Sequence, residues 1–163
     1  MSYFIVKELL DYIENVFKIL NQNMLYTLSF LFTTDLKKVL LIEKKRPEWQ
    51  KGFLNGIGGK VEGDENFVEC IERETFEETN LKINYDNSYK GKLIGNNYVV
   101  VVYSTLVEEN VIKENLKQTT DEKVKLYDIN NNLNLLSSVK YILPLCKESF
   151  IDKNLQKFEI NYL

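Results

Sequence analysis

One helix constrains this chain more than any other part of its sequence. The helix is predicted over Asp64 to Thr79, and at about 100° of rotation per residue Phe67 and Ile71 lie on one apolar stripe. Glu74 and Glu78 fall at nearly the same angle, so the stripe that should face the core becomes acidic in its last turns. A fold that contains this helix must give two inward-facing carboxylates a partner, because an unpaired buried charge is costly.

Two interpretations of these carboxylates are open. Arg73 is the only basic residue in the helix, and like charges four residues apart destabilise a helix. A hard cation such as Mg²⁺ or Mn²⁺ would hold Glu74, Glu77 and Glu78 together. The other interpretation is an acidic cluster on the surface. Three further glutamates project to the polar side and are explained as a solvated face: Glu65, Glu69 and Glu72.

Composition narrows the chemistry that the helix can support. The 163 residues include no histidine, which excludes Ser-His-Asp and Cys-His catalysis and histidine-ligated zinc or iron. The formal net charge of -3 argues against a nucleic-acid polymer as partner, since such proteins need a clustered basic surface. Cys70 and Cys146 lie far apart and predict no disulfide framework, which fits a reducing cytoplasm. Catalysis must therefore use carboxylates, lysines or a bound metal ion.

The remaining pattern predicts a single mixed domain over residues 24–163. A second helix is expected over Val139 to Glu148. Strands are expected at residues 25–32, 39–42, 93–94, 98–107, 124–129 and 158–162, and the first two form a hairpin. Strands and helices that do not alternate regularly favour an α+β fold, an α/β/α sandwich with a mixed sheet.

Residues 1–23 are expected to form a helical extension on this domain. Apolar residues recur at helical spacing from Phe4 to Leu20 with charged residues between them. These charges leave no apolar run long enough for a membrane span or a signal segment. The stripe therefore predicts packing against the domain or against a second copy, and a homodimer is favoured modestly.

The acidic helix and the residues before it match a known motif. The motif consists of a glycine, five residues, a glutamate and seven further residues. It continues with Arg-Glu, an apolar position, any residue, Glu-Glu, any residue, glycine and an apolar position. The residues that match are Gly59, Glu65, Arg73, Glu74, Glu77, Glu78 and Leu81. This pattern resembles the Nudix box. Thr75 stands at an apolar position and Asn80 replaces a glycine, for which Asn is the next best residue at a left-handed helix end.

The approach to the motif, from Leu54 to Val61, is similar to that of MutT-type nucleoside triphosphate pyrophosphohydrolases, including enzymes that remove oxidised purine nucleotides. The resemblance implies a Nudix fold and Mg²⁺- or Mn²⁺-dependent hydrolysis of a nucleoside diphosphate linked to another group. It implies a metal site formed by the carbonyl of Gly58 and the carboxylates of Glu74, Glu77 and Glu78. A carboxylate from a later loop often completes such sites, and Glu122 is our choice.

Several residues keep two interpretations each. By the resemblance, Glu65 pairs with Arg73 and fixes the loop on the helix. Lys60 contacts the phosphates or is simply an exposed lysine. Asn55 offers its amide to a base or is a turn residue. Glu122 is a metal ligand or an ordinary surface-loop acid.

The expected reaction is attack of water on phosphorus, with Glu74, Glu77, Glu78 and Glu122 as catalytic residues. Glu74 or Glu122 would orient or deprotonate the water. A purine (d)NTP, normal or oxidised, would give a nucleoside monophosphate and pyrophosphate. The alternatives are a nucleotide sugar, a non-catalytic nucleotide-sensing module, and a dinucleoside polyphosphate, for which Tyr98 is suitably placed unless it only packs in a strand.

Overall fold

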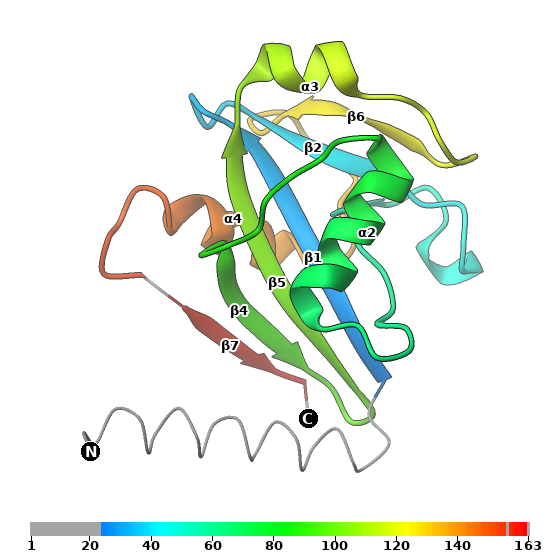
Figure 1. Ribbon diagram of the computed structural model, residues 1–163. Coiled ribbons are helices and arrows are strands. Elements are labelled where there is room, and N and C mark those ends of the chain that lie inside the picture. The colour runs from blue at the N-terminus through cyan, green and yellow to red at the C-terminus, as the bar shows by residue number, and fades with distance from the viewer. Residues whose placement is uncertain (1–23, 156, 163) are drawn as a thin grey trace.

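The computed structural model describes residues 24–155 and 157–162, and the helix predicted within residues 1–23 lies outside them. Each face of a mixed sheet is covered by one of the two longer helices (Figure 1). The strands are β1 Met24–Thr33, β2 Lys38–Glu43, β3 Leu54–Asn55, β4 Tyr89–Ile94, β5 Tyr98–Val107, β6 Lys123–Asp128 and β7 Phe158–Asn161. The helices are α2 Phe67–Thr79, α3 Glu109–Asn115, α4 Val139–Glu148 and the short 3-10 helix η1 Glu48–Gln50.

The sheet has the order β3-β2-β1-β5-β4-β7. Strand β6 lies off this path and pairs with β2. Its centre is the parallel pair of β1 and β5, which runs from Met24 opposite Tyr98 to Thr33 opposite Val107. The β-branched run at residues 99–102 suits this central position, because such side chains pack well on a sheet that is covered on both faces.

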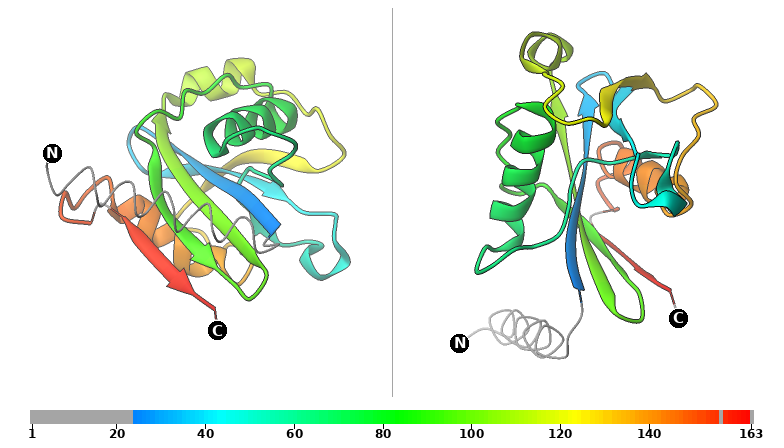
Figure 2. Two further views of the ribbon diagram at one scale, coloured as in Figure 1. Left: turned by 60° about the horizontal axis from the view of Figure 1, so that its bottom comes forward. Right: turned by 90° about the vertical axis from the view of Figure 1, so that its right-hand side faces the viewer.

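Two core clusters lie on the two faces of the sheet, as Figure 2 shows for the helices that cover them. Phe30 and Phe32 of β1 belong to the cluster with α4, whereas Leu31 between them belongs to the cluster with α2. This division follows from the alternation of side chains along a strand. Helix α2 is thereby held on one face by Ile71, which is fully buried.

The glycine-rich segment that precedes α2 lies along β1. Antiparallel bridges pair Ser29 with Ile57 and Tyr26 with Lys60, and the N–H of Thr27 donates to the carbonyl of Gly59 at 2.8 Å. Strand β1 therefore pairs with β2 through residues near the C-terminal end of β1. Its earlier residues pair with the glycine-rich segment. The arrangement places the glycines between β1 and the acidic helix.

The structure confirms the predicted fold class, the α4 boundaries and the β1–β2 hairpin. The predicted start of α2 at Asp64 was wrong by three residues. Asn66 caps the helix, since its side chain accepts hydrogen bonds from the N–H groups of Val68 and Glu69, and the carboxylate of Glu69 accepts the N–H of Asn66. Glu69 is thus a capping residue rather than only part of a solvated face.

Three elements were not predicted. Strand β3 has two residues, which is too short for a periodic signal, and α3 and η1 are short and largely polar. None of the helices within residues 24–155 and 157–162 has the length and apolar character needed to cross a membrane.

Candidate functional site

The glycines before α2 allow the helix to approach the sheet closely. A Cβ on Gly59 would lie 2.3 Å from Oε1 of Glu74, and a Cβ on Gly58 would lie 2.2 Å from the carbonyl oxygen of Thr27. Gly58 also has a φ of 149°, which side chains rarely adopt. Larger residues at either position would push the loop away from β1 or from the carboxylate of Glu74.

Glu78 is the least compensated carboxylate of this region. It is partly buried, and its Oε2 accepts the N–H of Gly58 at 3.1 Å. Burial raises the pKa of Glu78 to about 7, against the opposing effects of Lys44 and the Gly58 N–H, while Glu74 and Glu122 add to the increase. The carboxylate is therefore held where its charged form needs a cation.

Glu74 lies beside the glycines, and its side chain is 15% exposed. Burial raises the pKa of Glu74, although the guanidinium of Arg73 lowers it. Both inward-facing carboxylates of α2 thus have a pKa above the usual range, while Glu77 is more exposed at 56%. The rotation of the helix accounts for this difference.

Arg73 connects the loop to the helix. Its Nε and Nη2 donate to the two oxygens of Glu65 at 2.9 and 2.7 Å, and its Nη1 donates to Glu74 at 2.8 Å and to Glu77 at 3.1 Å. The Nη2 also reaches the carbonyl of Lys60 at 3.1 Å. These hydrogen bonds from Arg73 hold the pKa of Glu65 at about 2, and the pKa of Arg73 is raised in return.

Glu122 is buried, so it is not an ordinary surface-loop acid. Its Oε2 accepts Nζ of Lys44 at 2.7 Å, and its Oε1 accepts the backbone N–H of Lys45 at 2.7 Å and that of Arg46 at 3.4 Å. Burial alone would raise the pKa of Glu122, but these donors lower it. The charge of Glu122 in turn adds to the rise in the pKa of Glu78.

The C-terminal end of α2 is held by the chain between α3 and β6. Asn80 has φ 63° and ψ 11°, which confirms the predicted left-handed helix end, and its Nδ2 donates to the carbonyl of Asn115 at 3.2 Å. The hydroxyl of Thr119 donates to the carbonyl of Glu77, and the N–H of Lys117 donates to that of Thr79 at 3.0 Å. Helix carbonyls that would otherwise lack partners are thereby satisfied.

The threonine at an apolar motif position has a structural explanation. Thr75 is fully buried, and its hydroxyl shares a hydrogen bond of 2.7 Å with the hydroxyl of Tyr85, which is 1% exposed. A buried polar group with a partner is tolerated in a core. Leu81, the last motif residue, is also buried in this cluster.

Asn55 and Lys60 keep modest roles in the structure. The Oδ1 of Asn55 accepts the N–H of Gly56 at 2.8 Å, which favours its interpretation as a turn residue and leaves its Nδ2 as the group to offer a base. The side chain of Lys60 is exposed at the rim of the loop that Arg73 holds.

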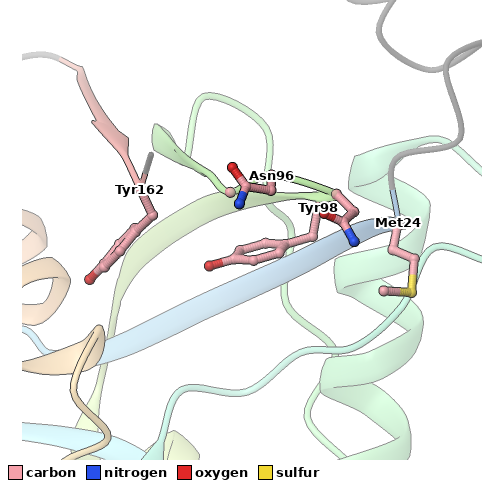
Figure 3. Close-up of a pocket in the computed structure, with 6 residues that line it drawn as sticks. Met24, Asn96, Tyr98 and Tyr162 are labelled. Carbon is pink, nitrogen blue, oxygen red and sulfur yellow. The ribbon is translucent and has the colours of Figure 1, made fainter.

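A pocket of about 360 Å³ lies apart from the α2 carboxylates, at the turn between β4 and β5. Figure 3 shows the rings of Tyr98 and Tyr162 beside Asn96 and Met24. None of the carboxylates described above lines this pocket. Tyr98 starts β5 and packs against the core on the α4 face, as its strand interpretation predicted.

The oxygen donors near α2 have the chemistry that a hard cation prefers. Among the residues that the structure describes, no group of three or more Asp, Glu, His or Cys side chains forms a ready-made metal site. Arg73 engages Glu74 and Glu77, and Lys44 engages Glu122. Glu78 fits a cation best, because its buried charge has the weakest compensation.

Sequence reasoning missed Lys44, whose Nζ donates to Glu122 at 2.7 Å and whose charge opposes the rise in the pKa of Glu78. The run of three cations at residues 44–46 was a visible signal. Its meaning depends on the register of β2 and β6, in which Glu43 lies opposite Lys123. The next pair in that register is Lys44 and Glu122.

Comparisons with known proteins agree with this geometry. The family model of the NUDIX domain matches residues 25–142. The structure is similar to a MutT protein from Bacillus halodurans, with 20% identity, a TM-score of 0.61, and coverage of 85% of this chain and 90% of that one. No match was found among curated proteins.

Two further solved structures share the fold. A NUDIX hydrolase from Nitrosomonas europaea has 16% identity and a TM-score of 0.63, with coverage of 86% of this chain and 80% of that one. An ADP-ribose pyrophosphatase from Streptococcus suis also has 16% identity, with a TM-score of 0.56 and coverage of 85% and 98%. At such identities the likeness concerns the fold and not the substrate.

Proposed function

This chain belongs to the Nudix family of hydrolases, and from that membership we propose that it hydrolyses a purine (d)NTP, normal or oxidised, to a nucleoside monophosphate and pyrophosphate. The observation that carries the proposal is the acidic end of α2 against the glycine loop. There Glu74 lies over Gly59, and Glu78 accepts the N–H of Gly58. Two desolvated carboxylates at one backbone turn suit the handling of a polyphosphate through a divalent cation.

The residues that would hold Mg²⁺ or Mn²⁺ are Glu74, Glu77, Glu78, Glu122 and the carbonyl of Gly58. When bound, the cation neutralises phosphate charge and lowers the pKa of water. Arg73 positions Glu74 and Glu77 through direct hydrogen bonds. Its two hydrogen bonds to Glu65 connect the loop to the helix.

Glu74 is the better candidate to orient or deprotonate the attacking water. Its pKa is raised by burial, which makes its carboxylate a stronger base near neutral pH. Glu122 has a lowered pKa, and both of its oxygens already accept hydrogen bonds. A role as ligand or as anchor of residues 44–46 therefore suits Glu122 better.

The purine assignment depends on the similarity of residues 54–61 to MutT-type enzymes and on the amide that Asn55 has left to donate. Lys60, exposed at the rim, would contact phosphates. Tyr98 lines a pocket with none of the proposed ligands, which gives no support to a dinucleoside polyphosphate. Cys70 and Cys146 are both free and buried, in agreement with the cytoplasmic location that we propose.

A substrate panel tests the reaction. The full chain is incubated with Mg²⁺ and normal or oxidised purine (d)NTPs, pyrimidine (d)NTPs, ADP-ribose or a dinucleoside polyphosphate, and products are identified by ³¹P NMR. We expect pyrophosphate and a monophosphate, with the highest kcat/KM for a purine (d)NTP. Release of inorganic phosphate, or a clear preference for ADP-ribose, would contradict the proposal.

Removal of the metal should abolish turnover. Excess chelator is expected to lower the rate at least about a thousandfold, because only a cation can neutralise the polyphosphate next to these carboxylates. Readdition of Mg²⁺ should restore the rate. Undiminished hydrolysis in chelator would remove the metal from the proposed function.

A further inference from the structure

Lys44 differs from its neighbours in how far it is withdrawn from water. Its side chain is 17% exposed, whereas that of Lys45 is 51% exposed and that of Arg46 is 79% exposed. Lysine is rarely buried unless it is paired. The partner is Glu122, whose Oε2 lies 2.7 Å from Nζ of Lys44 and whose side chain is 11% exposed.

The backbone fixes this pair in place. Strands β2 and β6 are antiparallel neighbours (Figure 1), and the pairing of Glu43 with Lys123 brings Lys44 and Glu122 opposite each other. The N–H of Lys45 then donates to the same carboxylate at 2.7 Å. Strand register therefore holds the ammonium and the carboxylate together, so the pair does not depend on chance contact of flexible side chains.

The charge of Lys44 also reaches the helix. Burial raises the pKa of Glu78, and the ammonium of Lys44 and the N–H of Gly58 oppose that rise. The ammonium of Lys44 thus pairs directly with Glu122 and also acts on Glu78 of α2 through its charge. Charges separated by several Å with little intervening water interact strongly.

We infer that Lys44 competes with the divalent cation for Glu78 and Glu122 and thereby weakens the metal affinity of the site. The inference rests on the proposed function, in which these two carboxylates are metal ligands. A cation that binds these carboxylates is repelled by the ammonium of Lys44. It must displace that ammonium from Glu122 or share the carboxylate with it. Glu122 keeps the N–H groups of Lys45 and Arg46 as partners when the ammonium is absent.

Metal binding without nucleotide tests this inference. Mn²⁺ is titrated calorimetrically into the full-length wild type and into the Lys44→Met variant at pH 7.5. We expect Lys44→Met to bind Mn²⁺ about tenfold more tightly, since like-charge repulsion at the site is removed. An affinity that is unchanged or weaker would overturn the inference and identify Lys44 as a support for Glu122.

Matched variants separate charge from other effects. Lys45→Met removes an exposed ammonium one residue away and should change the affinity less than about twofold, because exposed charges are screened. Lys44→Arg keeps the charge and should bind as the wild type does. If Lys44→Met does not fold by circular dichroism, Lys44→Gln takes its place, with the same tighter binding expected.

The outcomes distinguish this inference from the proposed function. If the wild type and every variant fail to bind Mn²⁺ and none hydrolyses nucleotide, the metal site itself is wrong, and the inference fails with it. If the wild type binds Mn²⁺ and hydrolyses nucleotide but Lys44→Met binds no more tightly, only the role of Lys44 fails.

Discussion

The glycine loop and α2 form one unit, in which Glu65 precedes the helix and Glu78 lies in its last turn. The pKa values of these two carboxyl groups are shifted in opposite directions. Two hydrogen bonds from Arg73 hold the pKa of Glu65 at about 2. Burial with weak compensation raises that of Glu78 to about 7. The first carboxylate stabilises the fold, and the second is kept in a situation that the fold alone does not favour.

The difference arises from how one guanidinium is shared. Arg73 gives two hydrogen bonds to Glu65 and one each to Glu74 and Glu77, and none of these four bonds reaches Glu78. A carboxylate that is desolvated and poorly paired, with a raised pKa, is a common feature of functional sites.

We therefore expect the cation available to each glutamate of this motif to decide whether that residue supports the fold or serves the proposed metal site.

The substitution Glu78→Gln should produce the largest effect, because it removes the charge and keeps the shape. We expect kcat/KM to fall about a thousandfold, equal to about 4 kcal/mol of transition-state stabilisation. The free energy of unfolding should stay equal or rise, since a weakly compensated buried charge is lost. Steady-state kinetics with Mg²⁺ and urea unfolding at pH 7.5 measure the two quantities.

Glu72→Gln is the matched control for that variant, because Glu72 is exposed on the polar side of α2. It should leave both quantities unchanged. A Glu78→Gln protein that hydrolyses nucleotide at a near-normal rate would remove the functional half of the comparison.

The substitution Glu65→Gln tests the other end of the unit. It should lower the free energy of unfolding by about 2 kcal/mol at neutral pH, since two hydrogen bonds to a charged group are weakened. The pKa of Glu65 is about 2 in the fold and 4.5 ordinarily. Its contribution to stability is therefore fully present above about pH 4.5 and is lost as the pH falls from there toward 2.

Urea unfolding across this pH range gives the readout. The difference between wild type and Glu65→Gln should be constant from pH 7 to pH 5 and should shrink below about pH 4.5. A difference that stays the same down to pH 3 would mean that Glu65 contributes through packing and not through its charge.

The acidic end of α2 could be predicted from the sequence because it depends only on local structure. The angles of Glu74 and Glu78 follow from helix geometry alone, and the end at Asn80 follows from its backbone preference. The α2 start was misplaced because a capping box at Asn66 decides it. Lys44 could not be assigned, since its partner is 78 residues away and meets it only through the β2–β6 register.

The smallest effect is expected at the end of α2, where Asn80 adopts a left-handed conformation. Asn80→Gly should change the free energy of unfolding little, because glycine accepts this conformation but loses the hydrogen bond to Asn115. Asn80→Val should lower it by about 1 kcal/mol or more, because a β-branched residue resists a positive φ. Thermal and urea unfolding measure both variants.

Asn87 provides the matched control, since its φ of 60° is nearly the same but it lies in the turn before β4, away from the acidic end of α2. Asn87→Val should lower stability by a similar amount and leave kcat/KM unchanged under folding conditions. Asn80→Val should also lower kcat/KM, because the last turn that it distorts carries Glu77 and Glu78. Equal kcat/KM values for the two valine variants would mean that the helix end supports the fold without positioning the carboxylates. Equal stabilities of Asn80→Gly and Asn80→Val would contradict the conformational argument itself.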